Sequence, residues 1–250
     1  MLPLVPSLVG VAATAVLALL AVKGRALTPT AGAVAAGFGV VIVVSVGFPY
    51  LILLVLFVGA SFLATRYRIE EKRGRNLQEG LAGERGVSNV LAHIVIPTAL
   101  ALLGGFGFGA PSTIAILYSS ALSFAAADTL ASEFGVLAGR ARSILTFREV
   151  APGTNGGISG RGEAFAMASA VATAVVGLGL FEVFGSPIGS LPLFLLAVIV
   201  AGFLGCQVDS VLGEALENRG WLTKGSTNFF GMLSSIAIAL GLVLAVRGTV

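Results

Sequence analysis

Long runs of apolar residues follow one another along the whole chain, separated by shorter polar segments. A helix that spans a bilayer needs roughly 20 mostly apolar residues, because each residue advances about 1.5 Å along the axis. The runs predict such helices at residues 2–22, 30–46, 49–65, 87–104, 112–136, 164–184, 191–212 and 228–246. The expected fold is therefore all-α, a polytopic membrane helix bundle with about eight transmembrane helices.

Positive charge is confined almost entirely to alternate connections between these runs. All but one of the 15 Lys and Arg residues lie in segments 23–29, 66–86, 137–163 and 213–227, and the exception is Arg247. Basic residues mark the cytoplasmic ends of membrane helices, so we expect these four segments in the cytoplasm and both chain ends outside. The first run is longer than a signal-peptide core and has no basic residue before it, so it is expected to be retained. The chain is thus predicted to be a multi-pass protein of the cell membrane.

Composition excludes a soluble globular protein, because 56% of the residues are hydrophobic and only 11% are charged, against about a quarter charged in soluble domains. The single cysteine, Cys206, excludes an internal disulfide and a zinc cluster of thiolates. The net charge of +3 is divided among loops of mixed charge, so no nucleic-acid partner is expected. We interpret residues 1–250 as one transmembrane domain, with a scaffold at 1–65 and the candidate chemistry at 66–250.

The charged segment after the third run is expected to prolong that helix into water. Residues 66–75 are rich in charge, and Glu71 and Arg75 stand four positions apart. Opposite charges at this spacing support a solvated helix. We therefore predict that the third helix continues to about residue 75.

An acidic residue interrupts the fifth apolar run. Asp128 lies deep in the stretch 112–136, where an ionised side chain costs several kcal/mol at mid-bilayer and less near an interface. Such residues usually mark a site for an ion, a proton or a substrate. The alternative is a structural role, in which the acid pairs with a basic residue and holds two helices together.

The pattern around this aspartate occurs twice. Asp-[Ser/Thr]-x-x-small-Glu stands at residues 128–133 and again at 209–214, each time near the cytoplasmic end of a predicted helix. The two copies lie at similar depth and are expected to face each other across one site, as an internal repeat of helix pairs. Residues five apart on an ideal helix point about 140° from each other, so one straight helix cannot direct both acids at one ion. Gly135 and Gly213 are placed to let these helices end or unwind.

A glycine-rich segment, residues 152–162, precedes the sixth predicted helix. Its five glycines allow backbone N–H groups to converge on an anion, and the helix that follows adds a positive dipole end. This arrangement resembles a phosphate cradle, although no Gly-Lys-[Ser/Thr] closes it as in a Walker A loop and no strand is expected before it. A flexible loop without a ligand is the alternative. The candidate phosphate-binding residues are Gly153, Thr154, Asn155, Gly156, Gly157, Ser159 and Arg161.

Three isolated polar residues lie in or at the ends of predicted helices. Asn89 and Asn228 open the fourth and eighth helices, where capping is the commonest role of such residues. His93 is the only histidine and lies in an apolar helix. We therefore expect it to be a hydrogen-bonded packing residue and not a ligand.

Several of these signatures resemble those of a known membrane-protein family. They are Ala-Asp-Thr-Leu-Ala-Ser-Glu at 127–133, Gly-Thr-Asn-Gly-Gly-Ile-Ser at 153–159, Asp-Ser-Val-Leu-Gly-Glu at 209–214, and Asn228 with the apolar run after it. Together with Arg85 and the Val-Leu-Ala that follows Asn89, they cover most of the chain from about residue 70 onward. On these residues the chain resembles the integral membrane family of unassigned domain that contains plant phytyl-phosphate kinase.

The resemblance implies a polyprenyl-phosphate kinase. Such an enzyme adds a second phosphate to a lipid monophosphate, with a nucleoside triphosphate such as CTP as donor. The family often has an aromatic residue where Leu130 stands and an asparagine where His93 stands. Phytyl phosphate and other isoprenoid lipid phosphates therefore both stay candidates for the acceptor.

Phosphoryl transfer requires charge neutralisation and in-line positioning more than a nucleophilic side chain. The catalytic candidates are Asp128, Glu133 and Asp209. With Glu214 they are also the candidate ligands of one or two Mg²⁺ ions, because this metal prefers hard oxygen donors. The glycine-rich segment would hold the triphosphate, and Asn89 and Asn228 would orient a phosphate or the base.

Two other functions are compatible with the same residues. A lipid-phosphate nucleotidyltransferase would need nearly the same site. A cation-coupled transporter would use the repeated acids for its coupling ion. The position of the acids near the cytoplasmic face, and a repeat that is parallel and not inverted, count against the transporter.

Overall fold

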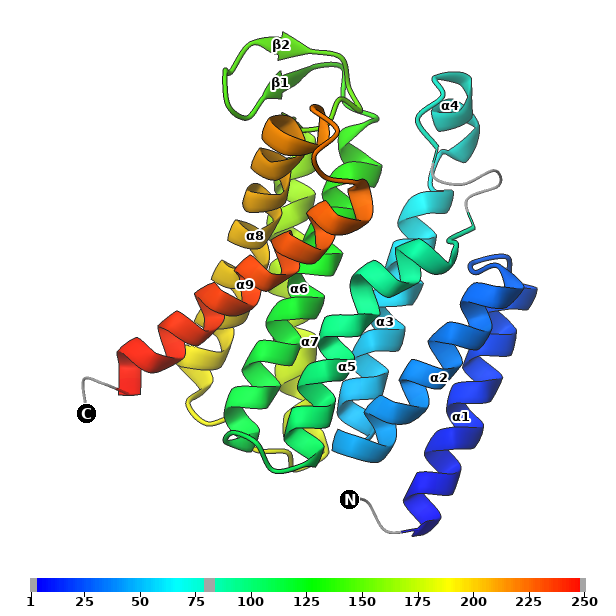
Figure 1. The fold of residues 1–250 in the computed structure, drawn as a ribbon, viewed down its shortest axis with the longest axis vertical. Helices are drawn as coiled ribbons and strands as arrows, with labels where there is room; N and C mark the ends of the chain where they lie inside the picture. The colour runs from blue at the N-terminus through cyan, green and yellow to red at the C-terminus, as the bar shows by residue number, and fades with distance from the viewer. Residues whose placement is uncertain (1–3, 79–83, 248–250) are drawn as a thin grey trace.

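A computed structural model describes residues 4–78 and 84–247 as a bundle of long helices with a small β-sheet at one end (Figure 1). The long helices are α1 (Leu4–Lys23), α2 (Pro29–Val46), α3 (Phe48–Arg66), α5 (Val87–Gly105), α6 (Pro111–Gly135), α7 (Gly160–Val183), α8 (Leu191–Leu212) and α9 (Lys224–Arg247). The shorter elements are α4 (Ile69–Gly74), β1 (Ala141–Ser143), β2 (Glu149–Val150), β3 (Gly157–Ile158) and the π-helical segment η1 (Gly213–Glu217).

The predicted all-α membrane bundle is confirmed. In the described ranges seven helices, α2, α3 and α5 to α9, are long and apolar enough to cross a membrane. The apolar stretch Leu8–Lys23 of α1 is shorter than such a span. α7 begins at Gly160, before the first apolar residue of its predicted run, because its polar first turn is capped by Ser159 Oγ, which accepts a hydrogen bond from Gly162 N.

α6 is the central helix and contacts α3, α5, α7, α8 and α9. Its most apolar window is 83% buried, whereas that of every other candidate span in the described ranges is at most half buried. Small residues let α8 come close to it, because a Cβ added at Gly202 would collide with the side chain and backbone of Ser123. In lipid, close packing of this kind holds helices together where the hydrophobic effect does not.

Gly202→Ala is expected to destabilise the bundle by about 1–3 kcal/mol, because α6 and α8 must move apart to admit the methyl group. Gly179→Ala is the matched control, since a Cβ there meets no atom within 4 Å. The measurement is the midpoint of thermal unfolding in detergent, which should fall for the first variant only. Equal midpoints for the two variants would contradict this account of the packing.

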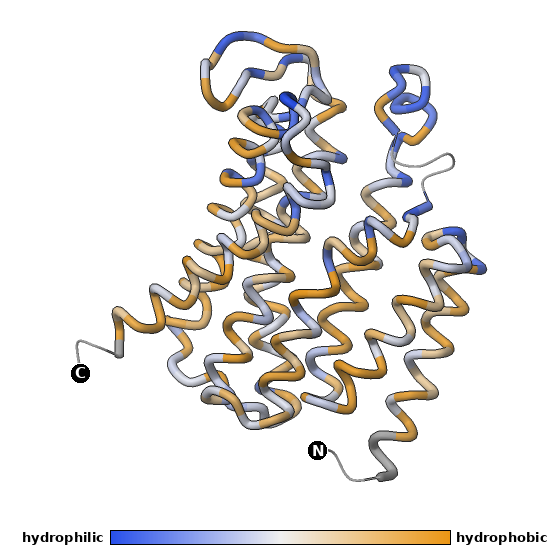
Figure 2. Tube along the Cα trace, viewed as in Figure 1, coloured by the Kyte–Doolittle hydropathy of each residue, from blue (hydrophilic) through white to orange (hydrophobic). Residues whose placement is uncertain are grey.

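The charged connections gather at one end of the bundle. The turn after α1, α4, the β-sheet and the connection from η1 to α9 all lie there, and α1 begins at the opposite end (Figure 1). Hydrophilic residues are concentrated at the same end in Figure 2. This agrees with the sidedness expected from the basic residues. That this end faces the cytoplasm stays a prediction.

The connection between α6 and α7 contains a three-stranded antiparallel sheet in the order β2-β1-β3. Arg142 on β1 pairs with Glu149 on one side and with Ile158 on the other. The prediction that no strand precedes the glycine-rich segment is wrong, because strands of two or three residues are too short to show an alternating pattern. Since β3 lies within that segment, backbone pairing holds part of it in place.

The predicted continuation of the third helix to residue 75 is also wrong. α3 ends at Arg66, Arg68 adopts a left-handed conformation with φ 53°, and the chain then turns into α4. The turn lets the buried Lys72 donate to backbone carbonyls at the end of α3. The expected ion pair between Glu71 and Arg75 is confirmed, with an N–O distance of 2.7 Å.

The two helices that carry the acid motifs end where their glycines predicted. α6 ends at Gly135, and the α-helical turns of α8 end at Leu212, before η1 begins with Gly213. A π-helical turn is a local irregularity that is frequent at functional sites. Asp209 therefore lies on α8 and Glu214 on η1, whereas both acids of the first motif lie on α6.

Candidate functional site

A polar cavity of about 340 Å³ lies at the charged end of the bundle. Its walls come from the last turns of α6 and α8, the first turns of α7 and α9, the glycine-rich segment and residues 76–78 after α4. Segments far apart in the sequence thus surround one space. A cavity of this size accommodates a small polar molecule or part of a larger one.

The structure brings together the aspartates of the two acid motifs. Asp128 on α6 and Asp209 on α8 both line the polar cavity, and their side chains interact directly. Gly231 on α9 allows this arrangement, because a Cβ there would lie 2.9 Å from Asp209 Oδ1. That oxygen is buried and has no hydrogen-bond partner among the described residues. A buried carboxylate oxygen of this kind is satisfied when a cation or a donor from a ligand binds.

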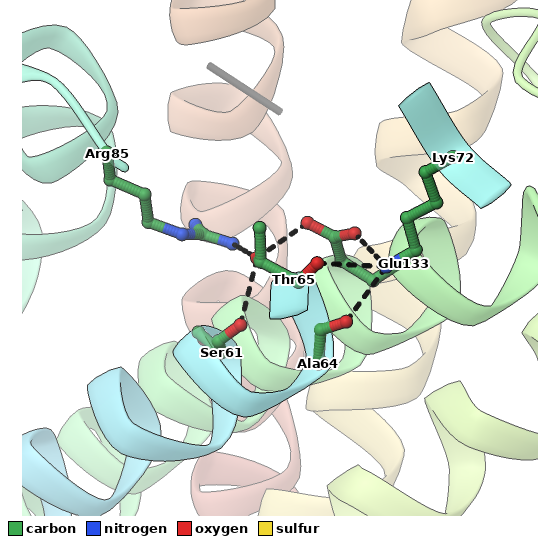
Figure 3. A network of polar contacts seen from close by, with 6 residues as sticks. All are labelled: Ser61, Ala64, Thr65, Lys72, Arg85 and Glu133. Atoms are coloured by element: carbon green, nitrogen blue, oxygen red, sulfur yellow. Dashed lines mark hydrogen bonds and ion pairs between the residues drawn. The ribbon is translucent and has the colours of Figure 1, made fainter. Parts of the chain in front are cut away.

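Glu133, the second acid of the first motif, lies on the cavity wall and is held by a network of buried polar groups (Figure 3). Its Oε2 accepts a hydrogen bond from Lys72 Nζ, and its Oε1 accepts one from Thr65 Oγ1, both at 2.7 Å. Lys72 is fully buried, and a buried charge needs such a partner. The pairing of an acid with a base across helices, which was the alternative for Asp128, is thus found at Glu133.

Glu214, the second acid of the second motif, binds the connection that contains the sheet. Its Oε1 accepts a hydrogen bond from Ser143 Oγ at 2.5 Å, and its Oε2 accepts one from Leu145 N at 3.2 Å. Three of the four predicted metal ligands line the polar cavity in the described part of the chain, and Glu214 is the one that does not. In this structure it anchors the sheet to the end of α8.

The glycine-rich segment forms one wall of the polar cavity. Gly156 has φ +76° and lies so close to α8 that a Cβ there would be 2.9 Å from the carbonyl oxygen of Ser210, so the position requires glycine. Arg161 lies outside the set of described lining residues, with its guanidinium carbon 5.8 Å from the centre of the Phe134 ring. The predicted phosphate-binding residues that do line the cavity are Gly153, Thr154, Asn155, Gly156, Gly157 and Ser159.

The two predicted asparagines lie at two different cavities. Asn228 on α9 lines the polar cavity, and its Nδ2 is 3.3 Å from His93 Nε2. Asn89 on α5 accepts a hydrogen bond from Arg85 Nη1 at 3.0 Å and lines a second, apolar cavity. His93 is buried, with Nδ1 2.9 Å from the carbonyl oxygen of Asn89. This agrees with the hydrogen-bonded packing role expected for the histidine.

Three charged residues that line the polar cavity were not predicted from the sequence, namely Glu163, Glu217 and Lys224. Glu163 accepts a hydrogen bond from Gln207 Nε2 at 2.9 Å, and Glu217 accepts one from Asn155 Nδ2 at 3.0 Å. Their positions were the available signal, because each stands within about one helical turn of a motif or residue already singled out. Whether such neighbours face the same cavity depends on how each helix is rotated about its axis. The sequence alone does not give this rotation.

Residues 12–243 match the family described as Integral membrane protein DUF92. The chain belongs to the DUF92 family. The match includes both acid motifs, the glycine-rich segment and Asn228. The polar cavity is therefore built entirely from the part of the chain that characterises DUF92 proteins.

Individual relatives match most of this chain. This chain is 31% identical to the uncharacterized membrane protein MJ0933 of Methanocaldococcus jannaschii. The aligned region of 219 residues covers 87% of this chain and 86% of that protein. The chain is 32% identical over 227 residues to the uncharacterized membrane protein sll0875 of Synechocystis sp., with coverages of 87% and 83%. Protein PGR of Arabidopsis thaliana is 30% identical over 196 residues, with coverages of 70% and 67%. No solved structure matches the chain significantly.

Two carboxylates in this DUF92 cavity would suit a Mg²⁺ ion whose other ligands were water and a phosphate. Within residues 4–78 and 84–247, no group of three or more His, Cys, Asp and Glu side chains is arranged so that it could hold a metal ion. Mg²⁺ is usually held by one or two carboxylates together with water and substrate phosphates. Asp128 and Asp209 supply such a pair, and the charge of Lys224 acts on the second of them.

Proposed function

We propose that this DUF92 protein is a membrane-embedded kinase that transfers the terminal phosphate of a nucleoside triphosphate to a polyprenyl-type lipid monophosphate. One observation carries the proposal: Asp128 and Asp209 meet the glycine-rich segment around a single polar cavity at the charged end of a membrane bundle. The resemblance of the same signatures to a family that contains a phytyl-phosphate kinase supports the acceptor class.

The acidic wall of the cavity would hold Mg²⁺ through Asp128 and Asp209. When bound, the metal would neutralise charge on the phosphates of the donor. Glu163 and Glu217 line the same cavity and would bind water molecules around the metal. Glu133 would act as a positioning residue, since its bonds to Lys72 and Thr65 hold the end of α6 in place.

The glycine-rich wall would bind the triphosphate, CTP or another nucleotide. Gly156 brings the backbone against α8, and glycines without side chains leave N–H groups accessible to phosphate oxygens. Ser159 caps α7 at the edge of the cavity, so the positive end of that helix dipole favours an anion there. Lys224, at the start of α9, adds a cation to the same space.

The reaction would take place at the cytoplasmic face of the cell membrane. The charged end of the bundle carries the basic connections, which are expected on the cytoplasmic side. The nucleotide would then enter from the cytoplasm, and the lipid phosphate would reach the cavity from the bilayer. An oxygen of the lipid phosphate would attack the γ-phosphorus, and the bond from the γ-phosphorus to the bridging oxygen would break. The products are the lipid diphosphate and a nucleoside diphosphate.

A lipid-phosphate nucleotidyltransferase is the second candidate, because the same cavity would suit it. That enzyme would attack the α-phosphorus and release pyrophosphate. A cation-coupled transporter is less well supported, since transporter sites lie near the bilayer midplane and this cavity lies at one end of the bundle.

The position of the transferred label tests the proposal. Purified protein is incubated with geranylgeranyl phosphate, Mg²⁺ and each nucleoside triphosphate, labelled at the γ or the α position. The expected result is γ label in a lipid diphosphate together with release of the nucleoside diphosphate. Label from the α position in the lipid, with release of pyrophosphate, would establish the nucleotidyltransferase. No turnover with any triphosphate would contradict both and favour the transporter.

A further inference from the structure

A second cavity, of about 280 Å³, lies between α1, α2, α3 and α5. Most residues of its walls are apolar, among them Leu17, Leu20, Leu51 and Phe57. Leu20 is 59% exposed, so the cavity opens at the outer surface of the bundle, where lipid is expected. We call this cavity the apolar groove.

The apolar groove has a polar end. Arg85, Asn89 and His93 line it at the start of α5, which is the charged end of the bundle. Arg85 Nη1 donates to Asn89 Oδ1 at 3.0 Å, which holds the guanidinium at this end. A guanidinium binds phosphate through paired N–H groups. The groove therefore combines walls that suit a hydrocarbon chain with an end that suits an anionic headgroup.

Polar side chains connect the wall of the apolar groove to the wall of the polar cavity, and Figure 3 shows the contacts among Arg85, Thr65 and Glu133. Arg85 Nη2 lies 3.5 Å from Thr65 Oγ1, and that hydroxyl donates to Glu133 Oε1 on the wall of the polar cavity. A second connection joins His93, which lines the groove, to Asn228, which lines the polar cavity. A ligand whose chain lay in the groove would thus have its headgroup at Arg85, on the groove side of these contacts, with the Thr65 hydroxyl between Arg85 and Glu133 on the wall of the polar cavity.

We infer that the apolar groove binds the single hydrocarbon chain of the lipid monophosphate acceptor, with the phosphate at Arg85, next to the polar side chains that border the polar cavity. The inference rests on the proposed kinase function and adds the place where the acceptor is bound. Lipid tails already surround a chain with apolar groups, so the hydrophobic effect alone does not draw it into the groove. The groove acts through shape and through the charge at its end, which together orient the headgroup for transfer.

The size of the groove favours one chain over two. A volume of about 280 Å³ is at the low end of ordinary ligand pockets. It holds part of one long chain, and the remainder would extend into the bilayer. The second chain of a diacyl phospholipid would find no place in it.

Photo-crosslinking tests the inference without requiring turnover. The probe is geranylgeranyl phosphate with a diazirine on its chain, added to the protein in phosphatidylcholine vesicles without nucleotide. Labelled peptides, identified by mass spectrometry, are expected from α2, α3 and α5. Unlabelled geranylgeranyl phosphate should compete with the probe, and a diazirine-bearing phosphatidic acid should label the same peptides much more weakly.

Gly59→Leu and Gly37→Leu form a matched pair for this experiment. Both positions are helical glycines where an added Cβ meets no atom within 4 Å, and Gly59 lines the groove whereas Gly37 is not one of its described lining residues. Gly59→Leu is expected to lower labelling about tenfold, which corresponds to about 1.4 kcal/mol. Gly37→Leu should leave labelling unchanged, because both variants have the same added side chain but only one obstructs the groove.

Several results would overturn the inference. One is equal labelling of the two variants, and another is labelling spread over the outer faces of α7 and α9. Equal labelling by the phosphatidic acid probe would identify the groove as a site for bilayer lipid and would also overturn it. If the groove is labelled as expected but no γ-phosphate reaches the lipid, the groove inference is supported and the kinase proposal is rejected.

Discussion

Asp128→Asn and Asp209→Asn are each expected to lower the rate of phosphoryl transfer by at least about a hundredfold. Each change removes one proposed metal ligand from the pair of carboxyl groups that meets in the polar cavity. The stabilisation of phosphate charge in the transition state is then weaker. Folding stability should not fall, because asparagine has nearly the same shape as aspartate and its neutral amide costs less to bury than a carboxylate.

The measurement is turnover of γ-labelled nucleotide with a lipid monophosphate at saturating Mg²⁺, together with the midpoint of thermal unfolding. Glu182→Gln is the matched control, since it neutralises an exposed carboxylate at the far end of α7. It should leave both turnover and the midpoint unchanged. If either aspartate variant kept near-normal turnover, the two acid motifs would not form one catalytic site.

Lys72→Met is expected to lower the free energy of unfolding by about 3–5 kcal/mol, because it leaves the carboxylate of Glu133 buried without its cation. The lysine side chain is completely buried and that of Glu133 is 8% exposed, with an N–O distance of 2.7 Å. Replacing both partners in Lys72→Met/Glu133→Leu should recover most of the loss, since two apolar side chains leave no unpaired charge.

Arg73→Met is the control for this second prediction. Arg73 is next to Lys72 on α4, and its ion pair with Glu70 has an N–O distance of 2.8 Å but is exposed to solvent. An exposed pair contributes at most about 1 kcal/mol. Unfolding is followed by denaturant titration in detergent micelles. A Lys72→Met protein as stable as Arg73→Met would show that the buried pair does not hold α4 in place.

The long helices could be predicted because burial in a bilayer depends on local sequence. Five helices begin and end within one residue of the limits expected from the apolar runs, namely α2, α3, α5, α6 and α8. The reason is that every backbone N–H and C=O group in lipid must form its hydrogen bond within the helix. The depth of Asp128 and Asp209 follows from counting residues along their helices. Their meeting in one cavity was therefore expected before the structure was known.

The partners of Glu133 and Glu214 could not be predicted in this way. The two residues occupy the same position of the repeated motif, but one binds Lys72, 61 residues away in sequence, and the other binds Ser143, 71 residues away. Both partners lie in connections that the sequence analysis described incorrectly, at the turn into α4 and in the sheet. Where each connection returns to the bundle therefore decides which partner each of these two acids has.

By itself, the sequence determined the membrane class, the number and limits of the apolar helices, and the end of the bundle that carries charge. Only the tertiary structure decided that Glu163, Glu217 and Lys224 share the cavity with the two aspartates, and that an apolar groove ends at Arg85 beside it. The physical reason is that hydropathy is a property of each residue taken by itself. Contact between side chains depends on how each helix is rotated about its axis and how closely its neighbours approach, and these follow from the packing of the whole bundle.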